Sequence, residues 1–189
     1  MAETEQGIIP GKEERLHKNN LAQIPNVAVS ESSKQKLISA LGLDVGRKRI
    51  GVAGCDRTGL IATGLMTIER QSFNQDVAIL QALVLERQVE VLVVGLPYTM
   101  SGSLGFQAKQ VQKLAQRLAQ ALNLPLEYVD ERLTSFQAEQ LLLAENISPS
   151  RHKSLIDRKA AALILQQWLD KRRAIKGVRE DLLSTRSEV

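Results

Sequence analysis

The chain has 189 residues, of which 43% are hydrophobic, so it is long enough for one full-sized core. No apolar stretch approaches the roughly 20 residues of a membrane helix, and residues 1–36 lack the apolar centre of a signal peptide. A single cysteine, Cys55, excludes an internal disulfide, and two histidines cannot build a histidine-rich zinc site. We therefore expect a cytoplasmic protein in a reducing compartment, without a membrane partner.

The net charge of +4 is concentrated at the C-terminal end of the chain. Residues 171–189 contain six lysines and arginines against three acids, and the rest is nearly neutral. A basic end suits a polyanionic partner. Aromatic residues make up only 3% of the chain, which argues against a protein that stacks bases on exposed rings. Contact with a nucleic-acid backbone is the predicted mode of binding.

Three segments are predicted along the chain. Residues 1–36 contain glycine, proline and asparagine without a sustained period, and their charges balance, which indicates a flexible extension. Residues 37–170 alternate apolar runs with turn signals and form the predicted domain. Residues 171–189 are the predicted basic tail.

Short apolar runs separated by turns open the predicted domain. Residues 41–46 and 50–53 predict two antiparallel strands joined by a basic turn at 47–49. A further turn at 56–59 leads to a third strand over 61–68. Three consecutive strands of this kind form an antiparallel meander.

Helices and strands then alternate. Asn74 can cap a helix that ends at Arg87, and an amphipathic stripe predicts a second helix over residues 106–122. Between these helices, residues 91–94 form a β-branched run typical of a central strand. Residues 126–129 form the last predicted strand.

Two further helices complete the predicted domain. A capping box of Thr134 and Gln137 starts a helix over about 135–144, and the final helix covers about 154–171. The order β-β-β-α-β-α-β-α-α predicts an α/β fold. Its five-stranded sheet is mixed, with the meander on one side, parallel crossovers on the other, and helices on both faces.

Acidic residues occur at three places where a site is expected. Asp44 interrupts an otherwise buried strand, Asp130 and Glu131 follow the last strand, and Asp157 lies in the first turn of the final helix. Sites in α/β sheets gather at strand ends. Clustered carboxylates need divalent cations, and oxygen ligands suit Mg²⁺ or Mn²⁺. The pattern favours phosphodiester hydrolysis by two ions about 3.5 to 4 Å apart.

Each acid also has a purely structural interpretation. Asp44 could accept hydrogen bonds from the turn that follows it, and Asp157 could complete a capping box with Ser154. The acids after the last strand could form surface ion pairs with Arg132. The spacing of the residues leaves both interpretations open.

Four motifs in a fixed order resemble a known family. They are residues 41–46 with 49–53, residues 93–97 with Gly102, residues 129–135, and residues 153–166. In this order they resemble the YqgF type of Holliday-junction-resolvase-like nucleases of precursor 16S rRNA, over about residues 38–169. The resemblance implies an RNase H-like fold, Mg²⁺- or Mn²⁺-dependent endonuclease activity, and trimming of the 5′ end of precursor rRNA, with pre-ribosomal particles as partners.

The resemblance also assigns roles to individual residues. Asp44 is the first catalytic acid and metal ligand, Glu131 the second, with Asp130 as its rival, and Asp157 the third. Contacts to phosphate fall to basic residues on the first hairpin and beside the acids: Arg47, Lys48, Arg132 and Lys153.

Two positions depart from the family pattern. Ser101 stands before Gly102, where many relatives carry an acid, and Leu96 and Pro97 stand where resolvases place an acid after the fourth strand. The pair after the fifth strand, Asp130 and Glu131, must then substitute for that acid.

Other functions remain open on the sequence. The domain could bind RNA as an assembly scaffold without catalysis, or it could resolve Holliday-junction DNA. Sugar kinases and actin-like phosphotransferases also begin with Asp-x-Gly in a hairpin. Their duplicated domain leaves little room in a chain of this length.

Overall fold

The computed structural model describes residues 38–99 and 103–131, five positions between 137 and 144, and residues 152–184, without the side chains of 176 and 178–184. The predicted extension, the Ser101–Gly102 pair, Arg132 and the capping box at Thr134 lie outside these residues. Within the described part, no helix has the length and apolar character needed to cross a membrane.

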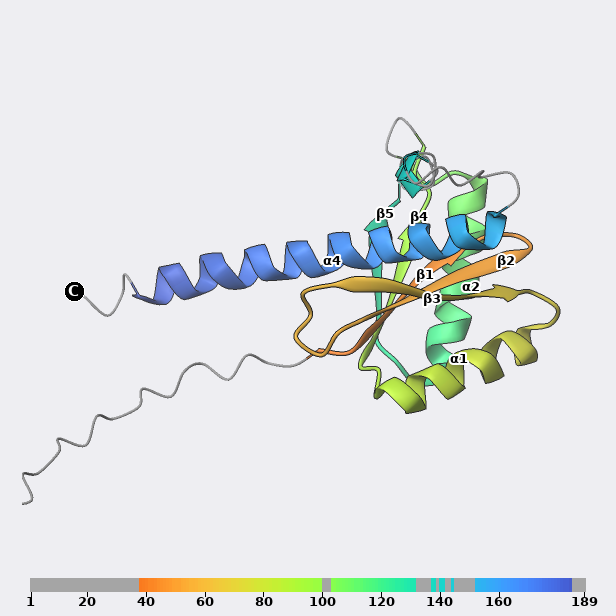
Figure 1. Ribbon diagram of the computed structural model, residues 1–189, viewed down its shortest axis with the longest axis horizontal. Helices are drawn as coiled ribbons and strands as arrows, with labels where there is room; N and C mark the ends of the chain where they lie inside the picture. Colours follow the sequence, from red (N-terminus) through yellow and green to blue (C-terminus); the bar gives the residue numbers. More distant parts are fainter. Residues whose placement is uncertain are drawn as a thin grey trace, which may run out of the picture. The chain divides into compact units, whose positions relative to one another are not determined.

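A mixed five-stranded sheet forms the centre of the domain (Figure 1). The strands β1 (Ala40–Val45), β2 (Arg49–Cys55) and β3 (Ala62–Glu69) form the antiparallel meander. Two strands, β4 (Val91–Leu96) and β5 (Leu126–Asp130), extend the sheet in parallel with β1, in the order β3-β2-β1-β4-β5. The predicted mixed sheet is confirmed.

Helices cover both faces of this sheet (Figure 1). On one face, α1 (Phe73–Arg87) and α2 (Phe106–Leu122) pack against a core that includes Leu43 and Leu92. On the other face, α4 (Lys153–Ser184) packs its Ile164 and Leu165 against a second core. The predicted arrangement of helices on both faces is confirmed, and α2 has the predicted bounds.

Side-chain alternation along β1 assigns Asp44 to the α4 face. Leu43 and Val45 belong to the core beneath α1 and α2. Gly42 faces α4, because a Cβ built on it would lie 2.6 Å from the Cβ of Leu165. Successive strand residues point to opposite faces, so Asp44 points to the same side as Gly42.

The first turns of α4 lie directly on the sheet beside Asp44. Gly51 of β2 pairs with Asp44, and a Cβ at Gly51 would lie only 2.0 Å from the carbonyl oxygen of Asp157. No residue with a side chain could occupy this position without moving the helix. Because Gly51 has no side chain, Asp157 can lie next to the pair of strands that carries Asp44.

Two predicted helix ends are wrong. The α1 helix begins one residue before Asn74, and Ser72 is its cap, with a hydroxyl that accepts the N–H of Gln75. The last helix runs to Ser184 rather than to about residue 171, and so enters the predicted basic tail. At the predicted end of the helix, Asp170 and Arg173 pair on its surface three residues apart, which favours continuation of the helix past residue 171.

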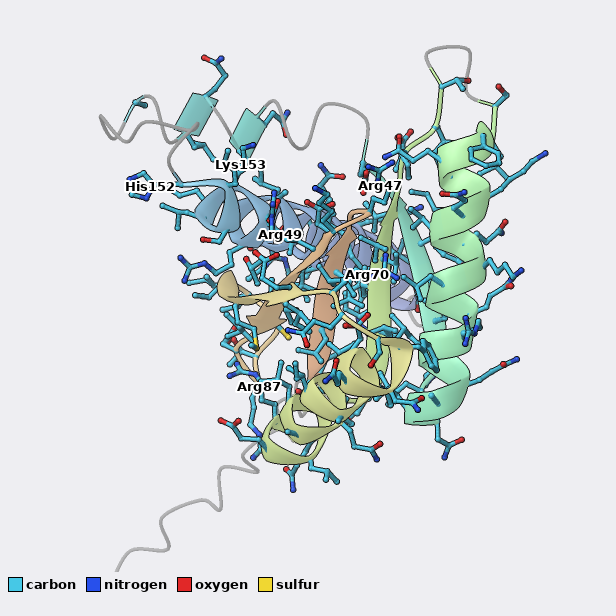
Figure 2. The ribbon with its side chains drawn as sticks, turned by 90° about the vertical axis from the view of Figure 1, so that its right-hand side faces the viewer. Arg47, Arg49, Arg70, Arg87, His152 and Lys153 are labelled. Atoms are coloured by element: carbon cyan, nitrogen blue, oxygen red, sulfur yellow. The ribbon has the colours of Figure 1, made fainter. Side chains whose placement is uncertain are left out.

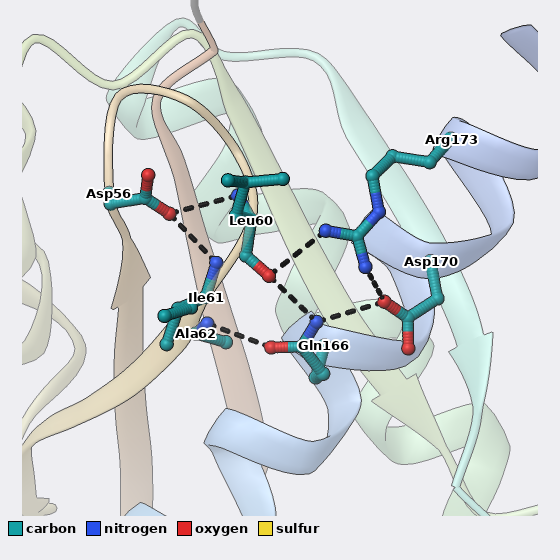
Figure 3. Close-up of polar contacts among 7 residues, drawn as sticks. All are labelled: Asp56, Leu60, Ile61, Ala62, Gln166, Asp170 and Arg173. Atoms are coloured by element: carbon teal, nitrogen blue, oxygen red, sulfur yellow. Dashed lines mark hydrogen bonds and ion pairs between the residues drawn. The ribbon is translucent and has the colours of Figure 1, made fainter.

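Polar contacts fix α4 to the turn between β2 and β3 (Figure 3). The amide of Gln166 donates to the carbonyl of Leu60 over 3.0 Å, and its oxygen accepts the N–H of Ala62 over 2.9 Å. Arg173 donates to the same Leu60 carbonyl over 3.1 Å while it pairs with Asp170. These bonds attach the middle of α4 to the meander and so support the position of its first turns.

Candidate active site

Asp44 occupies a largely enclosed position near the end of β1. The pKa of its carboxyl is raised to about 6, chiefly by burial and further by the charge of Asp157, with Arg49 acting in the opposite direction. The following turn is closed by the N–H of Gly46 and the carbonyl of Arg49, 2.9 Å apart, so it does not depend on the Asp44 side chain. This carboxylate is therefore placed where a cation would relieve its charge.

Glu131 reaches the same face from the end of β5. Its backbone N–H donates to the carbonyl of Leu96 over 3.1 Å. A Cβ built on Gly95 would lie 2.1 Å from its Oε2 atom, so the carboxylate lies over that glycine of β4. The pKa of Glu131 is raised to about 8, chiefly by burial and in addition by the charges of Asp44 and Asp130.

Side-chain alternation along β5 places Glu131 and Asp130, the two candidates for the second acid, on opposite faces of the sheet. The carboxylate of Glu127 accepts the indole N–H of Trp168 on α4 over 2.7 Å, and Val129 packs in the core beneath α4. Odd-numbered positions of β5 therefore face α4, as Asp44 does, and Asp130, which is exposed, points away by alternation. Of the two acids, Glu131 is the one on the face of Asp44.

Asp157 comes from the second turn of α4, and its carboxylate points to the sheet. It forms a hydrogen-bonded ion pair with Arg49 of β2, and the two side chains are 18% and 27% exposed. The pair raises the pKa of the Arg49 guanidinium. The start of the helix is closed instead by the carbonyl of His152, which accepts the N–H groups of Leu155 and Ile156.

Three acids thus approach one another from β1, β5 and α4. In the described ranges, however, no three acidic, histidine or cysteine side chains are already arranged to hold a metal ion. Carboxylate oxygens are nevertheless the donors that Mg²⁺ and Mn²⁺ prefer, and the raised pKa values of Asp44 and Glu131 reflect charges that a divalent cation would compensate. The residues present fit such an ion.

Basic side chains surround this end of the sheet (Figure 2). Arg47 and Lys48 are exposed at the turn between β1 and β2, and Lys153 is exposed at the start of α4. Figure 2 shows Arg47, Arg49 and Lys153 toward one end of the molecule and Arg87 at the other. The acids are therefore flanked by groups that could contact phosphate.

Comparison with known proteins decides the family. The RuvX family model, described as Holliday junction resolvase, matches residues 38–171. The chain belongs to the RuvX family. This match confirms the resemblance found in the motifs and the expected class of a nuclease, a hydrolase of phosphodiester bonds. The strand order and the family together confirm the RNase H-like fold.

Curated relatives of this RuvX chain have close sequences. A protein of Trichormus variabilis named "Putative pre-16S rRNA nuclease" is 78% identical over 138 residues, which cover 73% of this chain and 91% of that protein. A protein of Crocosphaera subtropica with the same name is 68% identical over 137 residues, covering 72% and 96% of the two chains. Both matches therefore cover more than nine tenths of the relative and less than three quarters of this chain.

Solved structures similar to the RuvX chain are more distant. A Thermus thermophilus RuvC in complex with a Holliday junction substrate is 15% identical, with a TM-score of 0.48, and the match covers 72% of this chain and 96% of that one. A fowlpox virus resolvase bound to Holliday junction DNA is 9% identical, with a TM-score of 0.46, and the match covers 71% and 98%.

Two features of the described structure were missed by sequence reasoning. Arg49 has no separate role in the motif analysis, although the alternation that puts Gly51 on the α4 face puts Arg49 there too. The other is the exposed ring of Phe106, which lies at the start of α2 and is 78% exposed. The low aromatic content of the whole chain does not show whether one particular ring is exposed.

Proposed function

We propose that this chain is an endonuclease that hydrolyses phosphodiester bonds of precursor 16S rRNA near its 5′ end, in the cytoplasm and on pre-ribosomal particles. The observation that carries the proposal is the approach of Asp44, Glu131 and Asp157 from three separate elements to one edge of the sheet. The names of relatives at 78% and 68% identity support precursor rRNA as the substrate.

The three acids would hold Mg²⁺ or Mn²⁺. When bound, such ions activate water and stabilise the leaving oxygen in phosphodiester hydrolysis. Asp44 is central in this scheme, because it interacts electrostatically with both Glu131 and Asp157. Glu131 is the preferred second ligand, and Asp130 is the alternative one. For Asp157 to join them, its carboxylate must turn from Arg49 toward Asp44.

The basic residues would position the substrate strand. Arg47 and Lys48 at the hairpin turn and Lys153 at the start of α4 are exposed near the acids, and long cationic side chains there would bind phosphates on either side of the cleaved bond. Arg132, beside Glu131 in the sequence, would complete this set. Since these contacts are ionic, we expect affinity to fall steeply with salt.

The decisive experiment is cleavage of a precursor that carries the 5′ leader. We expect Asp44→Asn to abolish Mg²⁺- or Mn²⁺-dependent cleavage while circular dichroism shows an unchanged fold. Glu90→Gln is the matched control, because Glu90 is exposed just before β4, at the opposite end of the parallel strands. Cleavage retained by Asp44→Asn would contradict the proposal.

Junction DNA is the second candidate substrate, because the family description names a Holliday junction resolvase. The cleavage rates of one preparation on precursor rRNA and on a four-way DNA junction separate the two substrates. A non-catalytic RNA-binding scaffold is the remaining alternative. It would show salt-dependent RNA affinity without divalent-ion binding in calorimetry.

A further inference from the structure

A hollow adjoins the β1–β2 hairpin on the side that faces α2. It has a volume of about 450 Å³ and lies between the hairpin turn, Arg70 and the first turns of α2. Val45 and Gly46, which directly follow Asp44, form part of its wall. In Figure 2, Arg47 and Arg70 lie toward α2, whereas Arg49 lies toward α4. The hollow therefore begins one residue from the acid site but opens on the other face of the sheet.

An aromatic ring and two amides form the α2 wall of this pocket. Phe106 is the first residue of the helix, and its side chain is 78% exposed although it is wholly apolar. Gln107 and Gln110, both exposed, line the same wall. A ring offers a stacking surface, and a carboxamide offers both a donor and an acceptor. This combination suits a flat heterocycle with polar edges.

The hairpin wall is cationic and firmly held. Arg70 donates to the carbonyl of Gly46 over 3.0 Å and pairs with the buried Asp76 at 3.3 Å, so its guanidinium fixes the turn from below. Arg47 is exposed at the same turn. Because Asp76 already compensates the charge of Arg70, the exposed Arg47 is the cation of the described lining that can contact an anion, and this lining contains no acid. A ligand that carries negative charge beside its ring is therefore favoured.

We propose that this pocket holds one unpaired nucleobase of the substrate strand, adjacent to the phosphate that is cleaved at Asp44. The base stacks on Phe106, its edge contacts Gln107 and Gln110, and its phosphate contacts Arg47. Pockets of several hundred Å³ hold ligands of this size, and RNA-binding proteins commonly splay single bases onto aromatic rings. The inference rests on the proposed nuclease function and adds a base-binding subsite to it.

Binding of a short precursor-derived RNA tests the pocket directly. The measurement uses Asp44→Asn protein, so that the RNA stays intact, and fluorescence anisotropy as the readout. We expect Phe106→Ala to weaken binding about tenfold, as for a lost base stack, and Phe106→Trp to retain it. Leu85→Ala is the matched control, because Leu85 is 70% exposed on α1 and lies outside the pocket. Equal affinity of Phe106→Ala and the control would overturn the inference.

A scan with single abasic nucleotides identifies the base. We expect one position next to the cleaved bond to lose about tenfold in affinity in the Phe106-containing protein, and to lose nothing further in Phe106→Ala. The same loss in both backgrounds, or a loss at no position, would show that no base occupies the pocket. If the protein with Asp44 intact still cleaves the RNA in that case, the nuclease function stands and only the subsite fails. Absence of both cleavage and RNA binding would overturn the two together.

Discussion

At the scale of single residues, Arg49 compensates part of the negative charge of the site. It pairs with Asp157 and also lowers the pKa of Asp44, so one guanidinium interacts with two of the three proposed ligands. A divalent cation bound by these acids would compensate the same negative charges. If the proposed function holds, Arg49 and a bound metal ion would compete for the same carboxylates.

Replacement of Arg49 by glutamine should make this competition visible. We expect Arg49→Gln to bind Mn²⁺ a few-fold more tightly in calorimetry, because Asp157 no longer has to leave a cationic partner. Arg57→Gln is the control, since Arg57 is an exposed arginine that bonds Gln88 instead of an acid. Weaker Mn²⁺ binding by Arg49→Gln would show that the arginine orients Asp157 for the metal rather than competing with it.

At the scale of elements, the approach of α4 and of the β5 end to the sheet depends on two glycines. At Gly51, an added Cβ would meet the backbone of Asp157, which only a shift of the helix could relieve. At Gly95, the Cβ would meet the flexible carboxylate end of Glu131 at 2.1 Å and the tip of Ile164 at 2.5 Å. The first change should displace an element, whereas the second should displace side chains.

We therefore expect Gly95→Ala to fold but to lose metal affinity and cleavage, because the Glu131 carboxylate must leave its place. The cost in stability should be about 1 to 3 kcal/mol, as for other overpacked cores, measured by urea unfolding. Gly177→Ala is a matched control, because a Cβ there meets nothing within 4 Å. Unchanged Mn²⁺ affinity in Gly95→Ala would contradict the role given to Glu131.

Most elements were predictable from the sequence, but their ends and faces were less so. The apolar stripe of residues 106–122 defined α2 fully, since its period and both ends are visible in the sequence. The cap at Ser72 was misassigned to Asn74, because two good capping residues stand two apart. The choice between Asp130 and Glu131 required the sheet, because helices cover both faces and strand alternation alone does not say which face holds Asp44.

At the scale of the whole molecule, the site and the pocket share one edge of the sheet. The parallel strands β1, β4 and β5 end there, so Asp44 and Glu131 are brought together by topology despite their distance in the sequence. Two carboxylates held close together and partly buried oppose folding whenever both are ionised. The site should therefore lower the stability of the whole metal-free protein in a pH-dependent way.

The direction of this pH dependence follows from the two raised pKa values. Asp44 shifts from 3.8 to about 6 and Glu131 from 4.5 to about 8, so the folded state binds protons more tightly than the unfolded state. Their contribution to stability is fully present below about pH 4 and is lost as the pH rises through 6 and then 8.

We expect metal-free Asp44→Asn/Glu131→Gln protein to exceed the wild type in urea-unfolding free energy at pH 9, by roughly 2 kcal/mol or more, and to approach it near pH 4. Mg²⁺ should stabilise the wild type at pH 8 and leave the double variant unchanged. Parallel pH profiles of the two proteins would show that these carboxylates are not strained by burial and mutual repulsion.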